Sequence, residues 1–158
     1  MQLIKDSLAP NFHLYDSMKN KISTDDFAGK KNLLLLFFPL AFTGVCTKEL
    51  CAVRDDMTKY HNLNAEVIGI SVDSVFTLAK FKEEQQLNFT LLSDFNKEVS
   101  SLYHTIYDSF TDMGMKGVSK RSAFIIDKQG IIRYAEVLES AGDVPNFEAI
   151  NIVLSSLN

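Results

Sequence analysis

The chain has 158 residues, of which 46% are hydrophobic and 23% are charged, as in ordinary globular proteins. Its 16 Lys and Arg against 20 Asp and Glu give a net charge of −4, which argues against nucleic acid and anionic membranes as partners. A chain of this length can bury about two-thirds of its unfolded surface in one core, so we expect a single domain over residues 1–158.

The N-terminal residues do not resemble a secretory signal, because Lys5 and Asp6 lie where such a signal needs an apolar stretch. The longest apolar run begins at Leu33 and is too short to cross a bilayer. Without a secretory signal, the two cysteines are expected to be reduced thiols rather than a structural disulfide. The sequence therefore predicts a cytoplasmic protein that does not associate with membranes.

Segments typical of strands and of helices alternate along the chain. The first thirty residues, with Phe12, Leu14 and Ile22, indicate a small hairpin and a turn laid on the core. The elements expected after them, in chain order, are a strand at 33–38, a helix containing Leu50, Val53 and Met57, a strand at 66–72, helices at 75–87 and 97–104, strands at 122–127 and 131–137, and a helix at 147–157.

The connections between these elements predict the fold class. Helix-containing crossovers between strands imply parallel pairing, whereas the compact turn 128–130 makes the last two strands an antiparallel hairpin. We therefore expect an α/β sandwich with a mixed central sheet flanked by helices.

Both cysteines lie just after the first predicted buried strand. Pro39 closes that strand because it has no N–H, and Thr43 is a residue type favoured at a helix N-cap. Cys46 is thereby placed in the first helical turn, where free backbone N–H groups favour a thiolate. The helix dipole contributes about 0.3–1 kcal/mol, so a further donor or cation is needed. A small buried hydrophobe is the alternative interpretation of Cys46.

Cys46 and Cys51 are five residues apart, which suits neither a CxxC pair nor a disulfide within a helix. Helix geometry separates their Cα atoms by roughly 8–9 Å. A disulfide needs about 4.4–6.8 Å. Cys46 shares its helix face with Leu50 and Val53, and Cys51 shares its own with Arg54. The pattern predicts that Cys46 points inward and Cys51 towards a polar flank.

Pro39, Thr43 and Cys46 form Pro-x-x-x-Thr-x-x-Cys, which resembles the active-site signature of peroxiredoxins. The wider string FFPLAFTGVC at 37–46 is most similar to the alkyl hydroperoxidase E-like branch. RSAFIID, which begins at Arg121, resembles the strand that starts with the active-site arginine of the family. The resemblance implies a thioredoxin-like fold and a peroxidase acting on hydrogen peroxide or alkyl hydroperoxides, with no cofactor and no metal.

The resemblance also implies roles for single residues. Cys46 is the peroxidatic nucleophile, which becomes a sulfenic acid. Thr43 and Arg121 hydrogen-bond the peroxide oxygens, Arg121 supplies the cation for the thiolate, and Pro39 shields the sulfur. Glu49, one helical turn beyond the nucleophile, is expected to fix the guanidinium. The simpler alternatives are an N-cap at Thr43, a solvated charge at Arg121, and a helix-dipole preference at Glu49.

The spacing of Cys51 resembles that in the bacterioferritin-comigratory (peroxiredoxin Q) branch, where the second cysteine resolves the sulfenic acid after the helix unwinds. The alkyl hydroperoxidase E-like branch usually lacks this cysteine. The resemblance thus implies an intramolecular Cys46–Cys51 disulfide reduced by thioredoxin or a related dithiol protein. A one-cysteine cycle, in which an external thiol attacks the sulfenic acid, is the alternative.

Other functions are weaker alternatives. A thiol–disulfide oxidoreductase would need a CxxC motif, and a redox-sensing interaction module would not need the complete Pro, Thr, Cys and Arg set. A zinc site could draw on the two cysteines, but His13, His61 and His104 have no ligand-like spacing.

The segment 108–118 combines the glycines of a loop with Phe110, Met113 and Met115. Exposed apolar groups of this kind often mark an interface, and Phe42 beside the active site can extend it. Related enzymes commonly pair through this end of the molecule, so we expect a homodimer.

Overall fold

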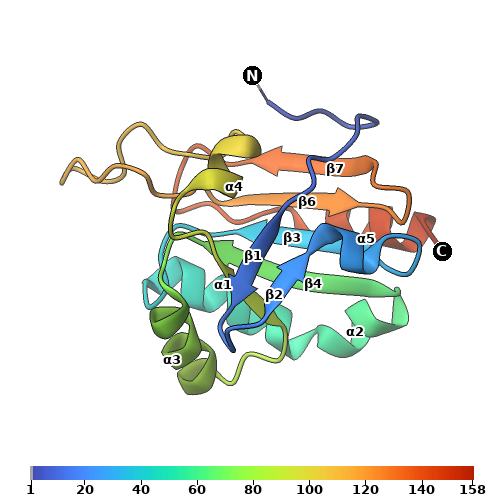
Figure 1. Ribbon diagram of the computed structural model, residues 1–158, viewed down its shortest axis with the longest axis horizontal. Coiled ribbons are helices and arrows are strands. Elements are labelled where there is room, and N and C mark those ends of the chain that lie inside the picture. Colours follow the sequence, from blue (N-terminus) through green and yellow to red (C-terminus); the bar gives the residue numbers. More distant parts are fainter. Residues whose placement is uncertain (1) are drawn as a thin grey trace.

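The computed structural model describes residues 2–158 (Figure 1). Within them, seven strands form one sheet in the order β2-β1-β5-β4-β3-β6-β7. The strands are β1 (His13–Asp16), β2 (Lys21–Ser23), β3 (Asn32–Phe37), β4 (Ala65–Ser71), β5 (Thr90–Ser93), β6 (Ser122–Ile126) and β7 (Ile132–Val137). The helices are the 3₁₀ helix η1 (Thr24–Phe27), α1 (Gly44–Asp55), α2 (Met57–Asn62), α3 (Val75–Gln85), α4 (Glu98–Leu102) and α5 (Phe147–Ser156).

The sheet is mixed, as expected. Strands β3, β4 and β5 are parallel neighbours, because α1 and α2 connect the first pair and α3 connects the second. Strand β6 pairs antiparallel with β3, and β7 pairs antiparallel with β6 at the edge of the sheet. The predicted α/β class and the predicted hairpin at 122–137 are therefore confirmed.

One local expectation is confirmed and extended, and another needs correction. The N-terminal hairpin packs on the core as expected, through Phe12, Leu14 and Ile22. It also extends the sheet, because β1 pairs with β5 through Tyr15 and Ser93. The helix after the first buried strand is divided, because α1 ends at Asp55 and α2 begins at Met57. Both features depend on tertiary pairing or local backbone geometry, which hydrophobic spacing does not encode.

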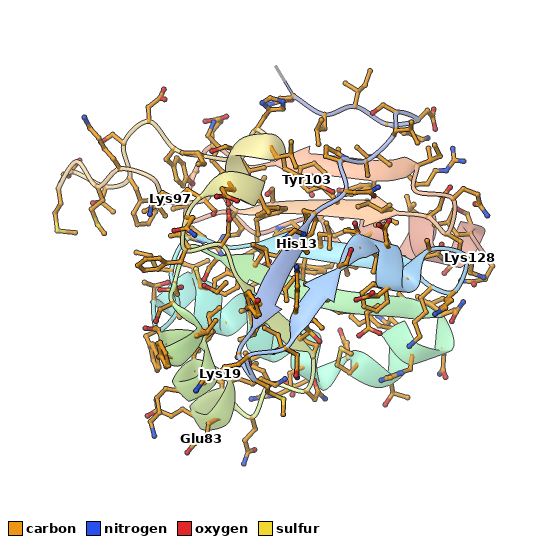
Figure 2. The ribbon with its side chains drawn as sticks, in the orientation of Figure 1. His13, Lys19, Glu83, Lys97, Tyr103 and Lys128 are labelled. Atoms are coloured by element: carbon orange, nitrogen blue, oxygen red, sulfur yellow. The ribbon has the colours of Figure 1, made fainter. Side chains whose placement is uncertain are left out.

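Strand β3 is the centre of the core, and all six of its residues are buried. Leu34 and Leu36 pack with residues of α1, α3 and α5 on one face. Leu33 and Leu35 pack on the other face, in the cluster that contains Tyr103 beside α4 (Figure 2). Because both faces are covered, the strand is apolar throughout, and burying each such side chain contributes about 1.5–3 kcal/mol.

The carboxyl ends of β3 and β4 lie at the same edge of the sheet, from which α1 and α3 depart (Figure 1). In sheets of this type, ligand sites form beyond the carboxyl ends of the parallel strands. The fold thus places the segment from Pro39 to Cys46 where a site is expected. No helix within residues 2–158 has both the length and the apolar character that a membrane span requires.

Candidate active site

The loop between β3 and α1 is held by two hydrogen bonds. The backbone N–H of Ala41 donates to Asp73 Oδ2 at 2.8 Å, and Thr43 Oγ1 donates to the Leu40 carbonyl at 2.7 Å. Thr43 occupies the N-cap position of α1, but its side chain makes no capping bond. Its hydroxyl proton is directed back to the loop, so the oxygen keeps its acceptor capacity. Pro39 at the start of the loop is buried, as a shielding role requires.

Phe42 gives this loop its sharp turn, with a φ of 68° in the left-handed region. A non-glycine residue pays roughly 1–2 kcal/mol for that conformation. The ring of Phe42 contacts the ring of Phe81 edge to face, with centroids 5.1 Å apart, which offsets part of the cost. Asp73 supports the turn from the segment just after β4, where its carboxylate also accepts from Ser71 Oγ at 2.6 Å. Asp73 was missed from the sequence, although a polar residue at the carboxyl end of a buried strand was a usable signal.

Cys46 lies in the first turn of α1 and is 1% exposed. Its side chain joins the core cluster that contains Leu50 and Val53, so the predicted inward orientation is confirmed. Arg121, directly before β6, donates from Nη2 to Cys46 Sγ at 3.3 Å. The structure thus brings together the thiol and the arginine, which are far apart in the sequence.

Arg121 is 1% exposed, so its interpretation as a solvated surface charge is wrong. Its Nη1 donates to Glu49 Oε1 at 2.7 Å, and its Nη2 also donates to the Ala141 carbonyl at 3.0 Å. Glu49 is itself 3% exposed. Removing one partner of a buried ion pair of this kind costs about 3–5 kcal/mol, because the other charge is left unpaired. The contact with Ala141 could not be predicted from the sequence, because it uses a backbone carbonyl, which every residue has.

The charge states of Glu49 and Arg121 follow from their burial and from neighbouring charges. Burial raises the pKa of Glu49 to about 7, against the charge and hydrogen bond of Arg121, which lower it. Burial works to lower the pKa of Arg121, but the charges of Cys46 and Glu49 outweigh it and raise the pKa above its ordinary value. Arg121 therefore stays charged and provides the cation that a thiolate at Cys46 needs in addition to the helix dipole.

The pair is not fully satisfied by the protein. Glu49 Oε2 and Arg121 Nε are buried and have no hydrogen-bond partner among the described residues. Buried polar atoms without partners are rare in folded proteins, and they concentrate at strained or functional places. A free donor and a free acceptor remain at the ion pair that contacts Cys46.

The surroundings of Cys51 differ in part from those expected. It faces the same side of α1 as Arg54, as predicted, but that flank is covered by the end of α3 and Cys51 is half-buried. Cys51 Sγ lies 3.5 Å from Gln85 Oε1, and Arg54 Nη1 donates to the Gln85 carbonyl at 2.6 Å. Both cysteines are free thiols on the intact helix α1.

The histidines considered for a zinc site are separated from the cysteines. His13, His61 and His104 are all exposed, and His13 lies on β1 (Figure 2). In the part of the chain that the structure describes, no three His, Cys, Asp or Glu side chains are grouped closely enough to hold a metal ion.

Residues 6–135 match the AhpC/TSA family. Alkyl hydroperoxide reductase E of Mycobacterium tuberculosis is 36% identical over 138 residues, which cover 86% of each chain. 2-Cys peroxiredoxin BAS1 of Spinacia oleracea chloroplasts is 35% identical over 139 residues, covering 82% of this chain and 50% of that protein. The mitochondrial thioredoxin-dependent peroxide reductase of Drosophila melanogaster is 33% identical over 156 residues, covering 92% of this chain and 62% of that protein. The chain thus spans about half the length of the chloroplast relative.

Solved structures agree with this family match. Peroxidoxin BcpB from Mycobacterium tuberculosis superposes with a TM-score of 0.86 at 25% identity, covering 98% of this chain and 97% of that chain. The reduced 2-Cys peroxiredoxin of Plasmodium vivax superposes with a TM-score of 0.83 at 28% identity, covering 95% and 79%. With a thioredoxin-like fold and a family match over most of its length, the chain belongs to the AhpC/TSA family, the peroxiredoxins.

Proposed function

We propose that this protein is a thiol-dependent peroxidase that reduces hydrogen peroxide and organic hydroperoxides. The observation that carries the proposal is the 3.3 Å contact from Arg121 Nη2 to Cys46 Sγ, which joins two buried side chains at the start of α1. A guanidinium in this position stabilises the thiolate and also the charge that moves onto oxygen during attack. The name of the mycobacterial relative, alkyl hydroperoxide reductase E, supports the same substrate class.

In the proposed reaction, the thiolate of Cys46 attacks one peroxide oxygen and the O–O bond breaks. A sulfenic acid forms on the sulfur, and the other oxygen leaves as hydroxide or alkoxide, which takes a proton from solvent. Thr43 orients the substrate, because its hydroxyl proton is held by Leu40 and its oxygen can accept from the peroxide O–H. Pro39, buried beside the loop, limits the access of water to the sulfur.

Recycling is proposed to use Cys51. Its thiol attacks the sulfenic acid, an S–S bond forms, and water leaves. The start of α1 must unwind for this, since both cysteines lie on one intact helix. Loss of the anion weakens the contact with Arg121 and lowers the cost of unwinding. A thioredoxin-like dithiol protein then reduces the disulfide, as the name of the Drosophila relative suggests, in a reducing compartment such as the cytoplasm.

The two cysteines should differ in a single-turnover experiment. We expect Cys46→Ser to abolish the reaction with peroxide, because only Cys46 contacts Arg121. Cys51→Ser should keep the first oxidation step and then accumulate sulfenic and sulfinic acid. Stopped-flow kinetics and intact mass after one equivalent of peroxide measure both effects.

The same experiment separates the two recycling routes. Non-reducing peptide mapping of the treated wild type should find Cys46 joined to Cys51. If it finds a lasting sulfenic acid with Cys51 free, then an external thiol recycles the enzyme and Cys51 has no part in resolution. Equal loss of the first step in both variants would contradict the assignment of Cys46 as the nucleophile.

Glu49 is proposed to fix the plane of the Arg121 guanidinium, and its raised pKa makes this measurable. Its pKa of about 7 in the folded state lies above the ordinary 4.5, so the folded state binds the proton more tightly. Its contribution to stability is complete below pH 4.5 and is lost as the pH rises to about 7. The loss has an upper limit on the order of 3 kcal/mol.

Glu49→Gln should therefore flatten the decline of unfolding free energy between pH 4.5 and about 7. Denaturant titrations across this range measure it, and Glu84→Gln on the exposed face of α3 is the matched control. An unchanged decline in Glu49→Gln would mean that another group titrates.

A homodimer through segment 108–118 and Phe42 is also proposed. The segment is organised by its own hydrogen bonds between Phe110 and Met115, and it stands out from the sheet near the end where β3 and β4 finish (Figure 1). Met113 at its tip is 78% exposed, and Phe42 is 47% exposed. Burial of these side chains by a second copy would remove apolar surface from water.

We expect Met113→Asp to shift the protein from dimer to monomer in sedimentation velocity at micromolar concentration, because the charge would be buried in the interface. Met18→Asp is the matched control, since Met18 is 70% exposed on the remote turn next to Lys19 (Figure 2). A wild type that sediments as a monomer throughout would refute the dimer.

A further inference from the structure

Tyr107 is a buried tyrosine whose hydroxyl has no hydrogen-bond partner among the described residues. The residue is only 8% exposed, so bulk water does not replace the missing partner. A buried hydroxyl without a partner loses its hydration and gains nothing in return. In an enzyme, such an atom suggests a group that is completed by the substrate.

The backbone holds Tyr107 beside the segment that leads into Arg121. Its N–H donates to the Val118 carbonyl at 3.0 Å, and its neighbour Ile106 pairs with Ser119. One side of its ring is fixed by Phe110, with centroids 5.3 Å apart. The ring position is therefore set by the same short pairing that positions the start of β6.

The charges of Arg121 and Cys46 both act on the hydroxyl of Tyr107, whose backbone is paired with the residues just before Arg121. Burial raises its pKa, the charge of Arg121 lowers it, and the charges of Glu139 and Cys46 raise it. The net effect is a rise, so the hydroxyl keeps its proton at neutral pH and acts as a donor. Arg121 Nε and Glu49 Oε2, in the ion pair that contacts Cys46, also have no hydrogen-bond partner among the described residues.

We propose that Tyr107 is a further catalytic residue of the site around Cys46, whose hydroxyl donates a hydrogen bond to the oxygen that leaves when Cys46 attacks. This inference rests on the proposed peroxidase function. In that step an electron pair of sulfur forms the S–O bond, the O–O bond breaks, and the electron pair of the O–O bond stays on the leaving oxygen. Negative charge grows there, so a fixed donor stabilises the transition state more than the bound peroxide.

The role differs from that of Arg121. Arg121 Nη2 already contacts the sulfur and the Ala141 carbonyl, so it acts close to the attacked oxygen. The hydroxyl of Tyr107 has no competing partner and is free to bind the second oxygen. Because this oxygen carries the organic group of an alkyl hydroperoxide, Tyr107 contributes to both classes of substrate.

Tyr107→Phe tests the proposal, because it removes only the unpartnered oxygen. We expect the second-order rate constant for hydrogen peroxide and for tert-butyl hydroperoxide to fall by about 10- to 100-fold. The alkylation of Cys46 by iodoacetamide should not change, since that reaction involves no peroxide oxygen. The thermal midpoint should stay equal or rise, because an unsatisfied buried group has been removed.

Tyr103→Phe is the matched control. Tyr103 is also buried, but its hydroxyl donates to the Pro10 carbonyl at 2.7 Å, away from the site. This variant should lower the thermal midpoint and leave the peroxide rate unchanged. Opposite effects on stability and rate in the two variants would identify a catalytic hydroxyl at Tyr107.

Two results would overturn the role of Tyr107 and leave the proposed peroxidase function standing. In the first, wild type and Tyr107→Phe react equally fast with peroxide. In the second, peroxide reaction and iodoacetamide alkylation slow in parallel, so that Tyr107 acts on the thiol and not on the peroxide. A wild type that does not react with peroxide at all would overturn the proposed function as well.

Discussion

The site depends on a single buried guanidinium. A charge with 1% exposure at Arg121 is tolerated only because Glu49, Cys46 and the Ala141 carbonyl surround it with acceptors. Each acceptor comes from α1 or from the segment after β7, so the arginine ties these segments to the start of β6. Conversely, the thiol gains a cation that the helix dipole alone does not supply.

The sheet positions this charge by strand register. Phe37 of β3 is the partner of Ser122 in β6, so Arg121 lies directly beyond the end of the strand that leads to the loop before Cys46. Asp73, from the end of β4, holds the same loop through the N–H of Ala41. Two neighbours of β3 thus fix the loop and its cation from opposite sides, on a core strand that is buried on both faces.

The sequence predicted those elements that depend on the local spacing of apolar and polar residues. The apolar run before Pro39 and the helical spacing after Cys46 predicted the strand, the helix and the inward thiol. The positions of Arg121 and Glu49 came from a family resemblance, because residues so distant in the chain meet only through tertiary structure. The cover of Cys51 by α3 and the unpartnered hydroxyl of Tyr107 depend on packing between elements, which periodicity does not report.

The peroxide reaction of Arg121→Lys, measured by stopped flow as a second-order rate constant, shows how far the site depends on the guanidinium. Lysine keeps the charge but lacks the planar fork that donates to Glu49 and Cys46 together. We expect a loss of roughly 10²–10³-fold with a retained fold. Arg133→Lys, at a half-exposed arginine paired with Asp127, should react like wild type. An Arg121→Lys rate constant equal to that of wild type would contradict the central role of the guanidinium.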